Sequence, residues 1–293
     1  MRNLGFSHAE TAGWTAALTT GSLAAGVILL AAFVLAERRV SHPLLPLRVV
    51  LDRARGGSYL SVGLAGIAVF GVFLFLTYYL QQVKGYSPVT SGLAFLPMIA
   101  CILIASNSSS ILLLPRVGPR ALIVTGMLLG GGAMTYLTQL TVTSSYAADI
   151  VPALVAMGLG FGMIFAPAIN TATAGVARQD SGVASALVNT MQQVGGSIGT
   201  AALSTVALTA TASYLTAHHT GQLAPVTAAV HGYTVAFAVS AVLFGIGALA
   251  AVLLLPSRRR LEELRNPAPA ASAATAASPS PASPSPTGSL PAA

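Results

Sequence analysis

The stretch GVASALVNTMQQVGGSIGTA, residues 182–201, decides the fold class because it combines the apolar character of a membrane helix with three side-chain amides. It lies in a run, residues 181–257, that contains no Asp, Glu, Lys or Arg. A helix needs about 20 mostly apolar residues to cross a bilayer, so this run has room for more than one crossing. Asn189, Gln192 and Gln193 therefore need polar partners at a depth where lipid offers none.

The composition of the whole chain also indicates a membrane protein. Of the 293 residues, 54% are hydrophobic and 7% are charged, whereas an ordinary soluble domain is about 25% charged. The mean hydropathy is +0.77. Seven charge-free windows of membrane length cover residues 14–36, 59–83, 89–114, 121–140, 150–175, 182–208 and 233–255. The sequence therefore predicts an all-α integral membrane protein with about seven transmembrane helices.

The positions of the basic residues predict the orientation, because short loops rich in Lys and Arg stay in the cytoplasm. Twelve of the 14 basic residues fall on one side of this topology, and only Arg2 and Lys84 fall on the other. We therefore expect a multi-pass protein of the cell membrane with its N-terminus outside and its C-terminus in the cytoplasm. The arginines are scattered over several short loops, so they form no single basic face for a nucleic-acid partner.

Four segments follow from these patterns. Residues 1–36 form an outer N-terminal segment without a visible cleavable signal peptide, followed by the first predicted helix. Residues 37–57 form a basic cytoplasmic loop whose leucines and valines suit the membrane interface. Residues 58–257 hold the last six predicted helices, and residues 258–293 form a basic and then Pro/Ala/Ser-rich tail that we expect to be disordered.

The amides belong to a polar stripe. Ser185, Asn189, Gln192 and Gly196 are separated by four, three and four residues, so they share one face of a helix. One interpretation is helix packing, in which amides bond across helices and Gly195 and Gly199 form a small-xxx-small contact. The other is that the stripe lines a water-filled path. The residues alone leave both interpretations open.

Other predicted helices carry similar candidates for the wall of a cleft. These candidates are Phe70, Phe73, Thr77 and Gln81 in window 59–83, Asn107 in window 89–114, and Phe161, Phe165 and Asn170 in window 150–175. Pro167 lies beside the last group and should kink or locally open its helix. Gly158 and Gly162 in the same helix suit close packing against a neighbour.

Three strings of the sequence together resemble a known family. They are ERRVSHPLLPLRV at 37–49, YLQQVKGYSPVTSGLAFLP at 79–97 and SGVASALVNTMQQVGGSIGTA at 181–201. In this order and spacing they resemble the fourteen-helix drug:proton antiporters of the major facilitator superfamily, over roughly residues 13–260. The run LLLPRVGPRALIVTG also resembles the gating-loop signature of the superfamily. Arg116, Gly118 and Arg120 match that signature, whereas Pro115 stands at its Asp position and Pro119 at a basic one.

The resemblance implies that the chain corresponds to the C-terminal portion of such a transporter. Residues 58–257 would be the C-terminal six-helix domain, built as a three-plus-three inverted repeat, and the first helix would be an extra linking helix. Protons would be handled by a missing N-terminal half. The sequence agrees with that assignment, because all seven acidic residues lie at helix ends, in loops or in the tail. By analogy, Asn189, Gln192 and Gln193 would flank a central cleft that admits a small-molecule substrate.

The implied function is proton-coupled efflux of drugs or other small molecules by alternating access. Two alternatives remain: a transporter of a lipid or metabolite on the same fold, and a truncated accessory or inactive membrane protein. An enzyme is not indicated, because the five histidines fall in predicted loops and no carboxylate pair lies near them. We expect no cofactor and no metal site, since the chain has a single cysteine, Cys101, and no helical histidine pair.

Overall fold

A computed structural model describes residues 53–173, 181–217 and 224–255, together with residues 25–26, 28–29, 31–32 and 35–36. The first predicted span and the basic loop lie mostly outside the described residues, and the tail 258–293 lies wholly outside them. Within the described ranges all regular structure is helical. Six helices there are long and apolar enough to cross a membrane, which confirms the last six predicted windows.

The spans are continuous runs of helix with short π-helical segments at some ends. The first described span is α4 (Arg53–Tyr78) with η1 (Tyr79–Val83), and the second comprises α5 (Pro88–Ala94), α6 (Leu96–Ser108), η2 (Ser109–Leu113) and α7 (Leu114–Val117). The third is α8 (Pro119–Leu137), and the fourth is η3 (Tyr146–Ile150) with α9 (Val151–Thr173). The last two are α10 (Ser181–Ala217) and α11 (Ala224–Leu254).

Local sequence explains where the second span begins and ends. Ser87 caps α5, because its hydroxyl accepts the Thr90 N–H at 3.2 Å and Pro88 occupies the first helical turn. The span ends at Gly118, whose φ of +81° is readily adopted by glycine. Pro119 then starts α8 at once, so the cytoplasmic connection predicted here is very short.

The predicted ends of α10 and α11 were wrong by about two turns. The windows 182–208 and 233–255 stop where threonines and other weakly polar residues enter, but α10 continues to Ala217 and α11 already begins at Ala224. The hydroxyls of Thr209 and Thr211 donate to the carbonyls four residues earlier, each at 2.8 Å. Because these side chains satisfy themselves within the helix, they do not end it.

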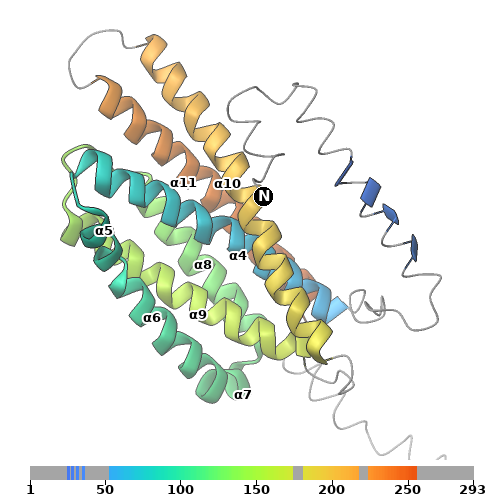
Figure 1. The fold of residues 1–293 in the computed structure, drawn as a ribbon. Helices are drawn as coiled ribbons and strands as arrows, with labels where there is room; N and C mark the ends of the chain where they lie inside the picture. Colours follow the sequence, from blue (N-terminus) through green and yellow to red (C-terminus); the bar gives the residue numbers. More distant parts are fainter. Residues whose placement is uncertain are drawn as a thin grey trace, which may run out of the picture. The chain divides into compact units, whose positions relative to one another are not determined.

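The helices form a row with two further helices packed beside it. Along the row α10 contacts α4, α4 contacts α9, and α9 contacts α6. Helix α11 contacts α10, α4 and α8, and α8 also contacts α9 (Figure 1). The spans of α4, α6 and α8 form one three-helix half, and those of α9, α10 and α11 form the other. The first helix of each half packs on the second helix of the other half: α4 packs on α10, and α9 packs on α6. This exchange is consistent with a three-plus-three repeat.

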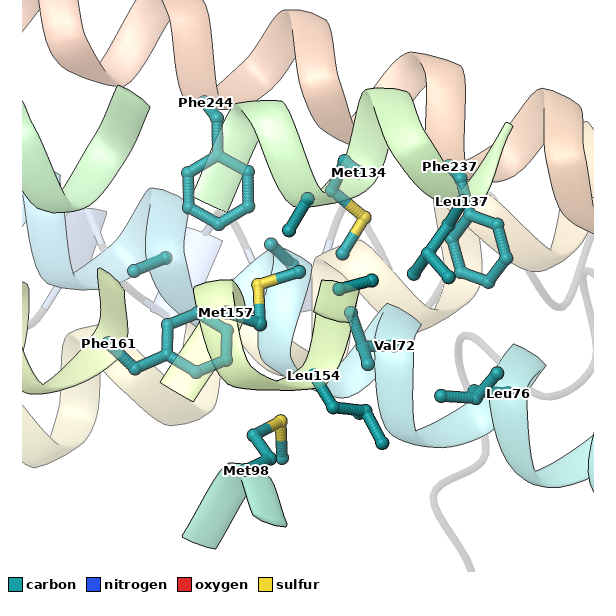
Figure 2. Packing of buried hydrophobic residues seen from close by; sticks show 14 of the residues in the cluster. Val72, Leu76, Met98, Met134, Leu137, Leu154, Met157, Phe161, Phe237 and Phe244 are labelled. Carbon is teal, nitrogen blue, oxygen red and sulfur yellow. The ribbon is translucent and has the colours of Figure 1, made fainter. Parts of the chain in front are cut away.

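The core lies where the row meets α8 and α11. Figure 2 shows Leu137 beside Phe237, with Met134, Val72, Leu154 and Met157 in the same cluster of buried side chains. All of these side chains are at most 1% exposed. Such dense packing fixes the helices relative to one another and leaves the outer flanks of α4, α6 and α10 without a partner among the described helices.

Candidate functional site

The site is built on the contact between α4 and α10. Gly195 faces the backbone of Gly63, and a Cβ added at Gly199 would lie 2.6 Å from the Cα of Ile67. One turn further, a Cβ added at Gly71 would lie 2.7 Å from the Leu203 side chain. Glycines thus allow the two backbones to approach closely, as in small-residue packing of membrane helices.

A second row of contacts runs beside the first. A Cβ added at Gly66 would lie 2.7 Å from the Gln192 carbonyl oxygen, and one added at Gly196 would overlap the ring of Phe70. This row leaves the amides of α10 at the edge of the interface. Gln192 is half-buried, whereas Asn189 and Gln193 are exposed.

Two aromatic rings of α4 lie next along this face: the Phe70 ring lies against Gly196, one turn from Gln193, and Phe73 follows one turn further along α4. Phe70 is 40% exposed and Phe73 is 37% exposed. The ring of Phe73 packs on Phe95, with 4.7 Å between ring centroids. We name the surface formed by Phe70, Phe73, Asn189, Gln192 and Gln193 the amide–aromatic surface.

Other predicted cleft residues lie elsewhere. Thr77 and Gln81 are half-buried and lie further along the same span, toward its outer end in the predicted topology. Phe161 is 1% exposed and packs in the core, 6.0 Å from Phe165 and 6.3 Å from Phe244 between ring centroids. In this conformation its ring therefore contacts other core residues and lines no open surface.

A separate polar cluster lies between η2 and the end of α9. The amide of Asn170 donates to the Ser110 hydroxyl at 3.4 Å, and the amide of Asn107 donates to the Leu103 carbonyl of its own helix at 2.8 Å. The hydroxyl of Ser109 is buried and has no hydrogen-bond partner among the described residues. Asn170 therefore bonds toward η2, and Asn107 bonds within α6, which stands at the opposite end of the row from α10.

The remaining glycines and the gating-loop candidates have clear positions. Gly158 lies against Met98 and Cys101 of α6, and a Cβ added at Gly162 would lie 2.7 Å from the backbone N of Ser106. At the junction of α7 and α8, Arg116 is exposed, Gly118 is buried and Arg120 is half-buried.

Sequence reasoning missed a cluster at the predicted outer ends of the helices. The Tyr79 hydroxyl donates to the Thr141 carbonyl at 2.6 Å, and Lys84 Nζ donates to the Val142 carbonyl at 3.2 Å. The hydroxyl of Tyr146 similarly donates to the Ala94 carbonyl at 2.8 Å. All three partners are backbone carbonyls, which carry no signal in a sequence.

Ionisable groups are scarce in the described part of the chain. Asp149 is its only acidic residue, and the carboxylate accepts the Ser145 N–H at 2.6 Å at the start of η3. No group of three metal-binding side chains is present in the described ranges. His231 was wrongly placed in a loop. It lies in α11, with its ring 5.0 Å from that of Tyr214.

Comparison with known proteins gives consistent relationships. The Major Facilitator Superfamily model matches residues 5–200. The chain is 48% identical over 255 residues to the puromycin resistance protein of Streptomyces alboniger, covering 86% of this chain and 50% of that protein. It is 36% identical over 204 residues to a cephamycin export protein of Amycolatopsis lactamdurans, covering 69% of this chain and 42% of the relative.

A lincomycin resistance protein of Streptomyces lincolnensis is 31% identical over 252 residues, which cover 83% of this chain and 47% of that protein. The chain thus spans about half the length, or less, of these relatives. The family consists of membrane transporters, so the helices surrounding the amide–aromatic surface are transporter helices and not the scaffold of an enzyme. The family match covers most of the chain, and we conclude that the chain belongs to the major facilitator superfamily.

Proposed function

We propose that the chain is the C-terminal part of a proton-coupled exporter of drugs or other small organic molecules. It would act by alternating access, together with an N-terminal half on the same or another polypeptide. Relatives named for antibiotic resistance and export support the direction of transport. Within the fourteen-helix drug:proton antiporters, residues 1–36 would supply a linking helix, 37–57 a cytoplasmic loop, 58–257 the transporter domain and 258–293 a cytoplasmic tail.

The exposure of Asn189 and Gln193 carries this proposal. Both amides lie within a span of membrane length, yet both are exposed. An unpaired amide is costly in hydrocarbon, so these side chains favour contact with water, substrate or a facing helix. The neighbouring rings of Phe70 and Phe73 supply apolar area for a drug-sized molecule. A few polar groups on a mainly apolar wall are typical of small-molecule sites.

The location of charge supports a division of labour between halves. Proton coupling needs an ionisable group that can be reached from either side of the membrane in turn. Asp149 is the only acid in the described ranges, and it caps η3 near a helix end. We therefore assign proton coupling to a part of the transporter outside the described residues. The same observation favours the second candidate function, an accessory membrane protein without transport of its own.

The size of the native polypeptide separates these two candidates. The protein would be detected in its own membranes through the C-terminal tail. A product much larger than 29.5 kDa supports an attached N-terminal half. A product at that mass requires a partner half, and efflux without any such partner would contradict the proposal.

Substitution of the amides tests the site in the complete transporter. We expect Asn189→Leu, Gln192→Leu and Gln193→Leu each to lower the rate of puromycin efflux by about two- to tenfold, the equivalent of one hydrogen bond. Membrane abundance should stay unchanged. The matched control is Thr190→Val on the same turn of α10, because the Thr190 hydroxyl already donates to the Ala186 carbonyl at 2.9 Å. Loss of abundance in the amide variants would show that the amides serve helix packing instead.

A further inference from the structure

The position of the Phe70 ring depends on Gly196. The Cδ2 and Cε2 atoms of Phe70 lie where a Cβ of residue 196 would be, so only glycine at 196 is compatible with this ring position. No such requirement applies to Gly132 or Gly245, where an added Cβ would meet nothing within 4 Å. Gly196 thus brings one side of the ring against the backbone of α10.

The other side of the ring remains open. Phe70 is 40% exposed although the residue lies near the middle of a span of 29 residues. Phe73 lies one turn further along α4, is 37% exposed, and packs its ring on Phe95. Each ring is therefore partly exposed and held by a contact with protein on one side.

Hydrogen-bonding groups flank Gly196 along the same stripe of α10. Gln193 precedes Gly196 by three residues, Thr200 follows it by four, and Asn189 precedes it by seven, so all four share one helix stripe. Asn189 and Gln193 are exposed and Thr200 is half-buried. No acidic residue lies at this depth among the described residues, so the hydrogen-bonding groups that this surface offers are amides and a hydroxyl.

We infer that Phe70, positioned by Gly196, is an aromatic platform for a planar ring of the transported molecule. The substrate class is an uncharged or weakly basic organic molecule whose aromatic ring carries hydrogen-bonding groups. The ring packs on Phe70, and the amides of Gln193 and Asn189 bond its polar substituents. Gly196 is a positioning residue, since it acts through Phe70. This inference rests on the proposed export function.

Puromycin efflux by the complete transporter in inverted membrane vesicles tests the inference. An aromatic contact and its buried area are together worth about tenfold in affinity, so we expect Phe70→Leu to raise the KM for puromycin about tenfold. Phe70→Trp should keep the KM within about threefold of the wild-type value. In both variants the Vmax per copy of protein should equal that of the wild type, because the ring contributes to substrate binding and not to the transport step.

The Gly196→Ala variant tests whether Gly196 acts through Phe70. We expect it to raise the KM as Phe70→Leu does, and the double variant Gly196→Ala/Phe70→Leu to show no further rise, because both act through one ring. Gly132→Ala is the matched control and should leave the KM and Vmax unchanged.

Three outcomes would overturn the inference. Equal losses in Phe70→Leu and Phe70→Trp, additive effects in the double variant, or a fall in Vmax and abundance at unchanged KM would each show that the ring packs against protein or lipid. Failure of the wild-type transporter to move puromycin or any other aromatic drug would instead refute the proposed function itself, and this inference with it.

Discussion

The hydroxyl of Tyr79 donates a 2.6 Å hydrogen bond to the backbone carbonyl of Thr141, 62 residues further along the chain. This bond connects η1 to the segment between α8 and η3. Lys84 donates to the next carbonyl of the same segment and also lies 5.8 Å from the centroid of the Tyr79 ring. The end of one span is thereby tied to the connection between two others.

We expect Tyr79→Phe to lower the free energy of unfolding by about 0.5–1.5 kcal/mol, the usual net contribution of one hydrogen bond. The ring is fully buried, and phenylalanine preserves its packing. The measurement is the Tm of the purified protein in detergent. Tyr136→Phe is the control, because its hydroxyl bonds the Ala148 carbonyl only 12 residues away in an exposed position. Equal Tm values for Tyr79→Phe and the wild type would refute the role of the bond.

The close contact of α4 and α10 predicts a different sensitivity at two glycines. A Cβ at position 195 would overlap the Gly63 carbonyl, so Gly195→Ala should destabilise the protein by about 1–3 kcal/mol, as overpacking does. Gly245→Ala meets open space and should be neutral or slightly stabilising. Thermal denaturation of both variants makes the comparison, and similar Tm values would contradict the contact.

Ser109 predicts a gain in stability on removal of a polar group. Its hydroxyl is buried without a partner, so Ser109→Ala should raise the stability by about 1 kcal/mol or more. Ser240→Ala is the matched control, because the equally buried Ser240 hydroxyl donates to the Ala236 carbonyl at 2.9 Å. If Ser109→Ala lowers the Tm, the hydroxyl has a partner such as a bound water, and the prediction fails.

The predicted orientation is tested by cysteine labelling from outside intact cells. In a Cys101→Ala background, Thr143→Cys should react with a membrane-impermeant maleimide, and Val117→Cys should react only after the cells are opened. Both positions are exposed, so access to the two thiols differs only through the membrane. Labelling of position 117 in intact cells would reverse the proposed topology.

The sequence was sufficient to predict the existence and order of six spans. A long apolar window without charge is compatible with few structures other than a membrane-spanning helix, and α8 and α9 begin and end within a few residues of their windows once η3 is included. It was insufficient for the outer end of α10, because a hydropathy window counts Thr209 and Thr211 as polar. Their hydroxyls are satisfied within the helix itself, and this information lies in geometry.

The candidate site was predictable only in part. The charge-free run drew attention to Asn189, Gln192 and Gln193, but their spacing does not tell which of them faces a neighbour. That distinction depends on the glycines of α4. The backbone at Gln192 packs closely against Gly66, whereas Asn189 is exposed at the edge of the helix interface. Phe161 illustrates the opposite difficulty, because an aromatic residue has the same pattern in a core as in a cavity wall.

The spacing of the contacts between α4 and α10 limits how these helices can move. Gly63, Ile67 and Gly71 meet Gly195, Gly199 and Leu203 at steps of four residues on both helices. A slide by one residue would bring bulky side chains against backbone, and the next comparable register is four residues, or about 6 Å, away. Small slides of α4 along α10 are therefore disfavoured, and we expect the two helices to move together as one rigid unit. In the alternating-access cycle proposed above, Phe70 and the amides of α10 would keep their mutual spacing, so that cycle would alter which side of the membrane reaches them and leave the shape they offer unchanged.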